Sequence, residues 1–251
     1  MCQLLGICAS REVDIRFSFG EWRHRGKKNP HGYGFVHWDG GQLVIVKAAS
    51  NLYDQKPAET DGVLAAHSRL FVAHVRLATV GARDGRNTHP FKTRTADRSF
   101  AFAHNGTVSE VKKRKLRQKP DGDTDSEHAF LFLLEGLADS SEDTFASRLK
   151  ELADEVRGLG RFNFLLSDGR YLWAYADNSL YFIERKPPYG GELVRLVDDG
   201  YSMSLDDLKR GDEQAVLVAT RPLTNEAGWQ KMTTGELLVV RDGLVETRFG
   251  R

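Results

Sequence analysis

The sequence predicts an α+β protein in which antiparallel sheets are covered by helices. Short apolar runs rich in β-branched and aromatic residues recur along the 251 residues, and Gly, Asp or Asn bounds them, as is typical of strands. Three tripeptides between such runs are typical of hairpin turns: Asp39-Gly40-Gly41, Ser167-Asp168-Gly169 and Arg241-Asp242-Gly243. Two adjacent segments of helical periodicity stand among these strands. This arrangement favours antiparallel meanders in layers covered by helices over regular βαβ units.

The apolar runs predict a series of strands that begins at the N-terminus. In chain order they lie near 2–9, 14–19, 33–38, 42–47, 70–77, 99–104, 162–167, 171–176, 180–184, 214–219, 236–241 and 244–248. The hairpin signals each stand between two consecutive members of this series. Neighbours along the chain are therefore expected to be neighbours in a sheet.

Helical spacing predicts two helices, near 125–137 and 142–157. The first begins at Thr124 or Asp125, and the second is followed by Gly158 and Gly160. Apolar residues recur three and four positions apart along both: Ala129, Phe130, Leu133, Leu134 and Leu137 in the first, and Phe145, Leu149, Leu152 and Val156 in the second. A weaker helix is expected over 57–69.

Composition excludes several classes of function. The chain has 36 basic and 35 acidic residues, which argues against an overall electrostatic footprint for nucleic acid or an anionic membrane. Two cysteines, Cys2 and Cys8, are too few for a disulfide framework and lack zinc-site spacing, so a cytoplasmic protein is expected. The apolar N-terminus is short and lacks a basic leader, so neither a signal peptide nor a membrane span is predicted.

A basic run over 112–119 contains six Lys or Arg residues and ends before Pro120. It is open to two interpretations, a phosphate-binding patch or a solvated loop between a strand and a helix. No aromatic residue is interleaved with these cations, as base stacking usually needs, and this favours the loop. A second segment, 187–213, is rich in Pro, Gly and Asp, and we expect either a loop over the functional site or a connector.

Cys2 directly follows the initiator Met1. If Met1 is removed, one residue carries both a thiol nucleophile and an α-amine whose ordinary pKa is near 8. The alternative is a small buried hydrophobe in the first strand, since free cysteines are often simply buried. The remainder of the chain decides between these interpretations.

Polar and Gly-rich segments stand at the ends of several apolar runs, where a rigid scaffold presents site residues. They are Met1-Cys2, HGYG at 31–34, HVRLAT at 74–79, HNG at 104–106 and TDSE at 124–127. Each has an ordinary alternative when taken alone. Arg76 could form a surface salt bridge, Asn105-Gly106 an ordinary turn, and Asp125 a helix N-cap.

Together and in this order, the segments resemble the class II glutamine amidotransferase domain of the N-terminal-nucleophile hydrolase superfamily. The resemblance is closest to the compact stand-alone YafJ-like and EgtC-like amidotransferases. It extends over CQLLGICA at the start, HGYGF, HVRLAT, THPF, AFAHNG and GDTDSE, and continues in VLVATRPL at 216–223. It implies a four-layer α/β/β/α sandwich of antiparallel sheets, formed by residues 1–251 as one domain from which Met1 is removed.

The resemblance also implies roles at matching positions. Cys2 would be the nucleophile, with Asn105 and Gly106 forming the oxyanion hole. The substrate would be held by Arg76 at its α-carboxylate, by Asp125 at its α-ammonium, by Thr79 at the carboxylate end and by Gly34 in the wall of the nucleophile pocket. These residue types suit a zwitterionic head group and a carbonyl that develops negative charge.

The implied chemistry is attack of Cys2 on the side-chain amide of L-glutamine. Ammonia leaves, a γ-glutamyl thioester forms and water hydrolyses it, with no metal or organic cofactor. His74, His89 and His104 lie beside motif residues, but their dispersed spacing does not predict a metal site. For His31, a structural hydrogen bond is expected.

Two departures from the synthase-type domains bear on substrate choice. Leu77 and Val80 replace the Trp and His that are common there, which puts strict preference for glutamine in question. The implied chemistry makes a glutamine-type amidohydrolase, which releases ammonia for a separate synthetase, the first hypothesis. The alternatives are a γ-glutamyl amide hydrolase acting on a larger metabolite and a non-catalytic accessory subunit. Oligomeric state is not predicted.

Overall fold

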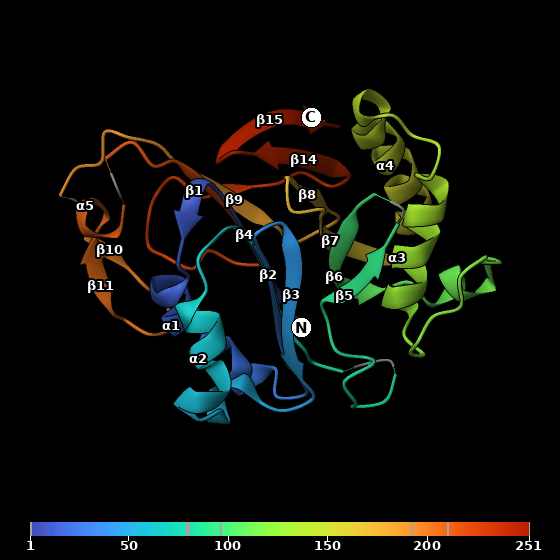
Figure 1. Cartoon of the computed structure of the whole chain (residues 1–251), viewed down its shortest axis with the longest axis horizontal. Helices are drawn as coiled ribbons and strands as arrows, with labels where there is room; N and C mark the ends of the chain where they lie inside the picture. Colours follow the sequence, from blue (N-terminus) through green and yellow to red (C-terminus); the bar gives the residue numbers. More distant parts are fainter. Residues whose placement is uncertain (1, 79–80, 96, 192, 210, 251) are drawn as a thin grey trace.

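Two antiparallel sheets stack face to face, and helices cover both outer faces (Figure 1). This computed structural model describes residues 2–78, 81–95, 97–191, 193–209 and 211–250. The order of layers is α1 and α2, the first sheet, the second sheet, then α3 and α4. The arrangement is the predicted four-layer α/β/β/α sandwich.

The first sheet has the strand order β13-β9-β12-β1-β4-β2-β3, and its printed pairs are antiparallel. Its strands are β1 (Gln3–Val13), β2 (Tyr33–Asp39), β3 (Gln42–Ala48), β4 (Ser68–Val75), β9 (Tyr181–Arg185), β12 (Ala215–Ala219) and β13 (Gln230–Lys231). Because β1 lies in the middle of this order, its first residues are enclosed by β4 on one side and β12 on the other.

The second sheet has the order β15-β14-β8-β7-β6-β5, again antiparallel. Its strands are β5 (Phe91–Arg94), β6 (Ser99–Thr107), β7 (Arg161–Ser167), β8 (Tyr171–Ala176), β14 (Glu236–Arg241) and β15 (Leu244–Phe249). A separate ribbon pairs β10 (Leu193–Arg195) with β11 (Ser202–Ser204).

Five α-helices are described: α1 (Arg16–Arg25), α2 (Pro57–Ala65), α3 (Asp125–Gly136), α4 (Glu142–Arg157) and the single turn α5 (Leu205–Leu208). The helices predicted near 125–137 and 142–157 are confirmed as α3 and α4. The helix expected over 57–69 ends at Ala65, because β4 begins at Ser68. Within the described part of the chain, no helix is long and apolar enough to cross a membrane.

Three apolar cores hold the four layers together. One lies between the sheets and includes Leu4, Val72, Leu165 and Leu238. A second packs α3 and α4 on the second sheet, and a third packs α1 and α2 on the first sheet. Both faces of the two sheets are therefore buried, which explains why many strands appear in the sequence as continuous apolar runs.

Two of the predicted hairpins close in two residues. Gly40 and Gly41 have φ of 53° and 81°, and Asp242 and Gly243 have φ of 47° and 75°. Positive φ at both central residues is the requirement of a type I′ turn, which matches the twist of paired strands. The third signal joins β7 to β8, where Gly169 has φ of 87°.

The strand expected over 14–19 is wrong, because α1 begins at Arg16. Ile15, Phe17 and Phe19 alternate as in a strand, but Ile15, Phe19 and Trp22 also recur four and three residues apart. The helical set is the buried one, packed on the outer face of the first sheet. The strands β5, β10, β11 and β13 were not predicted, and each has four residues or fewer.

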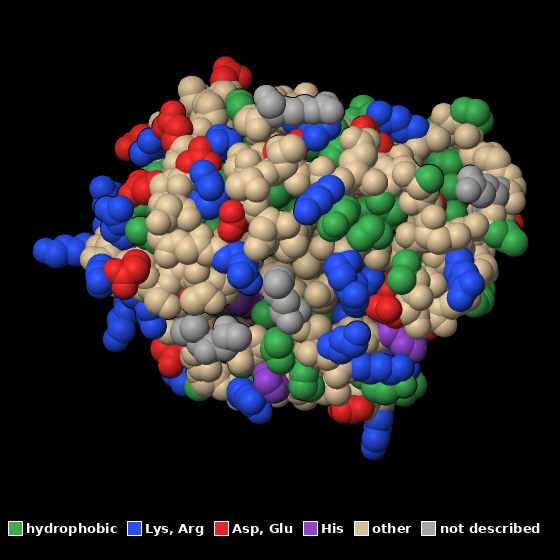
Figure 2. Space-filling model, turned by 180° about the vertical axis from the view of Figure 1, so that it is seen from behind, with side chains coloured by type: hydrophobic (Ala, Val, Ile, Leu, Met, Phe, Trp, Pro, Cys, Tyr) green, Lys and Arg blue, Asp and Glu red, His purple; other side chains and the backbone are tan. Residues whose placement is uncertain are grey.

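The basic run over 112–119 lies on the surface between β6 and α3. Lys112 donates to the Asp123 carbonyl at 2.7 Å, and Arg114 pairs with Glu155 at 2.5 Å. These partners favour the solvated-loop interpretation. Figure 2 shows, on the reverse face, Lys and Arg side chains scattered with Asp and Glu among them.

Candidate active site

Cys2 directly precedes β1, and its thiol lies against the end of β4. The Sγ accepts a hydrogen bond from Leu77 N at 3.2 Å and lies 3.4 Å from Leu77 O, to which the thiol donates. Burial raises the pKa of the Cys2 thiol, while the Leu77 N–H and the Arg76 charge lower it. Deprotonation at neutral pH therefore needs a nearby base.

Asn105 brings the second sheet to the same point. Its Nδ2 donates to the Cys2 carbonyl oxygen at 2.7 Å, so the end of β6 meets the start of β1. A side-chain amide carries two N–H groups, and this bond uses one of them. The ordinary-turn alternative for Asn105-Gly106 is wrong, because both residues lie within β6.

Gly106 follows in β6 and lies very close to β7. A Cβ at this position would lie 1.8 Å from the Arg161 carbonyl oxygen and 2.7 Å from Nε2 of His104. Only glycine lets the backbone pass this close without moving β7. Glycine at this position therefore lets β6 and β7 stay paired next to Asn105.

Arg76 comes directly after β4 and is 3% exposed. Its Nη1 donates to Ala82 O at 3.0 Å, and its backbone N–H donates to Gly32 O at 2.7 Å. The surface salt-bridge alternative is therefore wrong. Burial lowers the pKa of the Arg76 guanidinium, which starts high enough to stay charged at neutral pH.

His31 makes the structural hydrogen bonds expected of it. Its Nδ1 accepts from Ala78 N at 3.0 Å, and its backbone N–H donates to Arg76 O at 3.0 Å. An imidazole nitrogen can accept only when unprotonated. Burial, together with the charges of Arg83 and Arg76, lowers the pKa of His31 and favours the accepting form.

Asp125 opens α3 and is 3% exposed. Its Oδ2 accepts from Val108 N at 2.6 Å, which ties the helix to the chain just after β6. Thr124 is the N-cap and accepts from Glu127 N at 3.2 Å, so the N-cap alternative for Asp125 is wrong. The carboxylate is consequently fixed near the Asn105-Gly106 end of β6.

Gly34 and Thr79 are the two remaining residues of the predicted substrate site, and the structure describes only Gly34. Gly34 lies in β2, where a Cβ would approach the His89 carbonyl oxygen to 2.2 Å. Glycine at this position lets the segment around His89 pack against β2, and its role in a substrate pocket stays a prediction. Thr79, with its neighbour Val80, lies outside the described residues.

Three buried histidines lie behind the site. The rings of His74 and His89 pack at a tilt with centroids 4.3 Å apart, and burial lowers the pKa of His74 to about 3. His104 contacts Ser126 Oγ through Nδ1 at 2.8 Å and the Arg161 carbonyl through Nε2 at 3.2 Å. Among the described residues, no group of three or more His, Cys, Asp or Glu side chains could hold a metal ion.

Asn163 is a polar residue beside the site that the sequence analysis missed. It is fully buried in β7, opposite Asn105 in β6, and its Nδ2 donates to the Asn105 carbonyl at 3.1 Å. The sequence feature that points to Asn163 is an amide side chain inside the largely apolar strand RFNFLLS. A buried amide in such a run requires partners, and the sequence does not reveal them.

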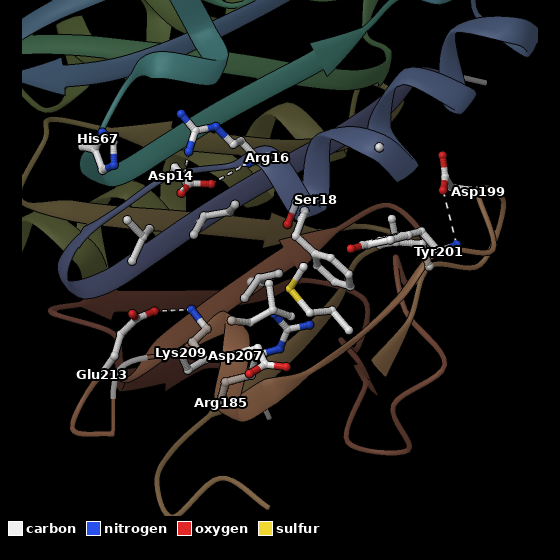
Figure 3. Close-up of a pocket in the computed structure, with 18 of the residues that line it drawn as sticks. Asp14, Arg16, Ser18, His67, Arg185, Asp199, Tyr201, Asp207, Lys209 and Glu213 are labelled. Carbon is white, nitrogen blue, oxygen red and sulfur yellow. Dashed lines mark hydrogen bonds and ion pairs between the residues drawn. The ribbon is translucent and has the colours of Figure 1, made fainter. Parts of the chain in front are cut away.

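A cavity with a volume of about 640 Å³ lies at the other end of β1 (Figure 3). It is lined by Asp14 and Arg16 at the start of α1 and by residues of the segment 187–213, among them Tyr201 and Lys209. Cys2, Arg76 and Asn105 are not among its lining residues. The segment 187–213 packs on α1, where Glu21 accepts from the backbone of Asp198, which favours the connector interpretation.

A family model described as class II glutamine amidotransferases matches residues 1–250. The chain belongs to this family. Two curated relatives of this amidotransferase cover most of its length. A Methanocaldococcus jannaschii protein is 36% identical over 97% of this chain and 70% of its own. YafJ of Escherichia coli is 34% identical over 94% of this chain and 96% of its own.

Solved structures agree with the family assignment. The crystal structure of a predicted glutamine amidotransferase from Pseudomonas aeruginosa is 27% identical, with a TM-score of 0.75, over 98% of this chain and 100% of that one. The phosphoribosylpyrophosphate amidotransferase of Bacillus subtilis, 18% identical, gives a TM-score of 0.64 over 96% of this chain and 47% of its own. The amidotransferase described here thus has the N-terminal-nucleophile hydrolase fold and belongs to a family of enzymes.

Proposed function

We propose that this amidotransferase releases ammonia from L-glutamine by nucleophilic attack of Cys2. The observation that carries the proposal is the convergence on one cysteine of two strand ends from different sheets. Leu77, next to Arg76, contacts the Cys2 sulfur, and Asn105 contacts the Cys2 carbonyl. A nucleophile, a buried guanidinium and an amide donor are the groups that this chemistry requires.

Removal of Met1 would expose the α-amine of Cys2 as the base. The amine, directly or through a water, accepts the thiol proton, and the thiolate attacks the side-chain amide carbon of glutamine. The tetrahedral intermediate collapses, the proton passes to the leaving nitrogen, and ammonia departs. Water then attacks the γ-glutamyl thioester, releasing glutamate and restoring the thiol.

Asn105 and Gly106 would stabilise the tetrahedral intermediate. In this proposal one N–H of the Asn105 amide stays on the Cys2 carbonyl, and the other joins the Gly106 N–H at the oxyanion. Loss of one such donor typically costs about 3–4 kcal/mol of transition-state stabilisation. His104, Ser126 and the Arg161 carbonyl support the backbone that presents these donors.

The amino-acid head group of the substrate would lie between Arg76 and Asp125. A guanidinium binds a carboxylate through two parallel hydrogen bonds, and a carboxylate pairs with an ammonium. Both side chains are buried, so their interactions with a bound zwitterion are little screened by water. Thr79 and Gly34 complete the proposed substrate site by resemblance to the family.

The proposal includes a single domain over residues 1–251, a cytoplasmic location, a small-molecule substrate and a separate ammonia-accepting synthetase. The γ-glutamyl amide hydrolase remains the alternative substrate assignment. It would use the same Cys2, Arg76 and Asp125 with an amine other than ammonia as the leaving group.

The test compares turnover of glutamine and of γ-glutamyl peptides by the wild type and by Cys2→Ala. We expect ammonia release from glutamine that Cys2→Ala abolishes. We also expect a single adduct of 6-diazo-5-oxo-norleucine on Cys2 in a chain that lacks Met1, measured by mass spectrometry. Peptide turnover faster by orders of magnitude would replace the substrate assignment. Ammonia release that survives in Cys2→Ala would contradict the mechanism.

A further inference from the structure

The side chain of Asn163 is the hub of a buried hydrogen-bond network beside the proposed oxyanion hole. Its Oδ1 accepts from three consecutive backbone N–H groups, those of Asp177, Asn178 and Ser179, at 2.9, 3.0 and 3.2 Å. Its Nδ2 donates to Asn105 O and to Asn178 Oδ1, both at 3.1 Å. Three N–H donors around one atom identify it as the oxygen, which fixes the orientation of the amide.

The two ends of this amide thus have separate tasks. The oxygen organises the turn between β8 and β9, which is a structural role. One N–H of the nitrogen goes to that same turn, and the other goes to the backbone of β6. With two hydrogens on the nitrogen and three donors on the oxygen, the bonding capacity of the side chain is used fully.

The bond to Asn105 O orients the peptide unit that joins Asn105 to Gly106. This peptide is trans, so its C=O and N–H point in opposite directions. The C=O points toward Asn163 in β7, and the Gly106 N–H therefore points away from β7. The neighbour of β6 on the side opposite β7 is β5. Among the described residues, β5 pairs with β6 only as far as Phe102, so no strand of this sheet lies opposite Gly106 on that side, and its N–H faces the open edge of β6.

We infer that Asn163 is a positioning residue that holds the Asn105–Gly106 peptide with its N–H aimed at the oxyanion. The inference rests on the proposed function, because it deepens the role of that same site. Asn163 does not touch the substrate. It acts through the carbonyl of Asn105, and its own position is fixed by the turn over 177–179. This turn, far along the chain, is thereby coupled to the reacting atoms.

The variant Asn163→Asp separates the structural task from the positioning task. A carboxylate keeps an oxygen for the three N–H groups of the turn. Its second oxygen replaces the donor and faces the Asn105 carbonyl, where two acceptors repel. The matched control is Asn178→Ala, which removes the other partner of Nδ2 and leaves the bond to Asn105 in place. Asn163→Ser, smaller and uncharged, repeats the test if Asp prevents folding.

We expect Asn163→Asp to lower kcat for glutamine by roughly 10- to 100-fold, because a misdirected oxyanion donor loses part of the stabilisation that a deleted donor loses entirely. The KM for glutamine should stay within about 2-fold of the wild-type value. Alkylation of Cys2 by iodoacetamide forms no oxyanion, so its rate should match the wild type. The activity of the variant relative to the wild type should rise as pH falls, because a protonated carboxyl regains a donor. Asn178→Ala should keep kcat within about 3-fold.

A wild-type kcat in Asn163→Asp would overturn the inference. Equal losses of turnover and of iodoacetamide reactivity would also overturn it, since they indicate general damage around Cys2. Failure of the proposed function would give a different result from failure of this inference. If the proposed function is wrong, a protein with native Asn163 and the substitution Cys2→Ala still releases ammonia. That result would contradict both the proposed oxyanion role of Asn105 and Gly106 and the positioning role of Asn163.

Discussion

The side-chain amide of Asn105 donates a hydrogen bond to the carbonyl oxygen of Cys2 at 2.7 Å. The two residues lie at the ends of strands from different sheets and are separated by 103 positions in the chain. Folding of both sheets is therefore required before the proposed nucleophile meets its oxyanion donors. The proposed chemistry depends on this junction.

Arg76→Lys should weaken substrate binding more than catalysis. Lysine keeps the charge but loses the planar fork that binds a carboxylate through two bonds, so we expect KM for glutamine to rise by roughly 10- to 100-fold with a smaller change in kcat. Steady-state kinetics of ammonia release measures both constants. The control is Arg83→Lys, an exposed cation nearby, which should leave KM nearly unchanged. Equal effects of the two substitutions would count against the carboxylate role of Arg76.

Activity should depend on His31 at acidic pH. Below the lowered pKa of this residue, Nδ1 is protonated and can no longer accept from Ala78 N, so the segment next to Arg76 loosens. The pH profile of kcat/KM in His31→Asn should therefore fall less steeply below the lowered pKa of His31, since an amide oxygen accepts without titrating. Superimposable profiles of the variant and the wild type would exclude His31 as the origin of the acid limb.

Buried His74 should make the protein less stable in acid. Its pKa is lowered to about 3 in the fold, while the unfolded chain takes up the proton near pH 6.5. The free energy of unfolding is therefore unaffected by this group above pH 6.5 and decreases as pH falls from there toward 3. At pH 5 the loss is about 2 kcal/mol. Urea denaturation at pH 7 and pH 5 should show this decrease, and a smaller one in His74→Met.

Gly106→Ala should be destabilising and inactive. The added Cβ would lie 1.8 Å from the Arg161 carbonyl, so β6 or β7 must move. We expect a loss of about 2–3 kcal/mol in the free energy of unfolding, together with loss of turnover through the displaced N–H. Gly85→Ala is the matched control, because a Cβ there meets nothing within 4 Å, and it should change stability by about 0.5 kcal/mol or less. Thermal unfolding of both variants measures the difference.

Much of the fold could be predicted because local chemistry determines it. Gly40-Gly41 and Asp242-Gly243 provide the positive φ that their turns require, and α3 and α4 have apolar residues at helical spacing. The segment 14–19 was misassigned because Ile15, Phe17 and Phe19 fit a strand as well as a helix. Packing on the first sheet decides between the two periods, and the local sequence does not contain that information.

The candidate site was predicted from an ordered set of short segments, each weak by itself. In the structure, Cys2 contacts Leu77 beside Arg76 and also contacts Asn105. Asp125 contacts the chain just after β6. No sequence spacing reveals these contacts. Asn163 was missed for the same reason. Its partners lie in β6 and in the turn over 177–179, and only the paired strands bring these segments together.

Several small side chains belong to the apolar layer between the two sheets. Ala101, Ala103, Ala174 and Ala176 of the second sheet face larger residues of the first, including Leu4. The size of these side chains contributes to the spacing of the two sheets, and therefore to the spacing between Cys2 beside the first sheet and Asn105 in the second. A larger side chain at one of these alanines would force the sheets apart or displace its neighbours, so it would strain the junction between Cys2 and Asn105 from inside the core. The packing of the core is thus part of what keeps Cys2 and Asn105 in contact.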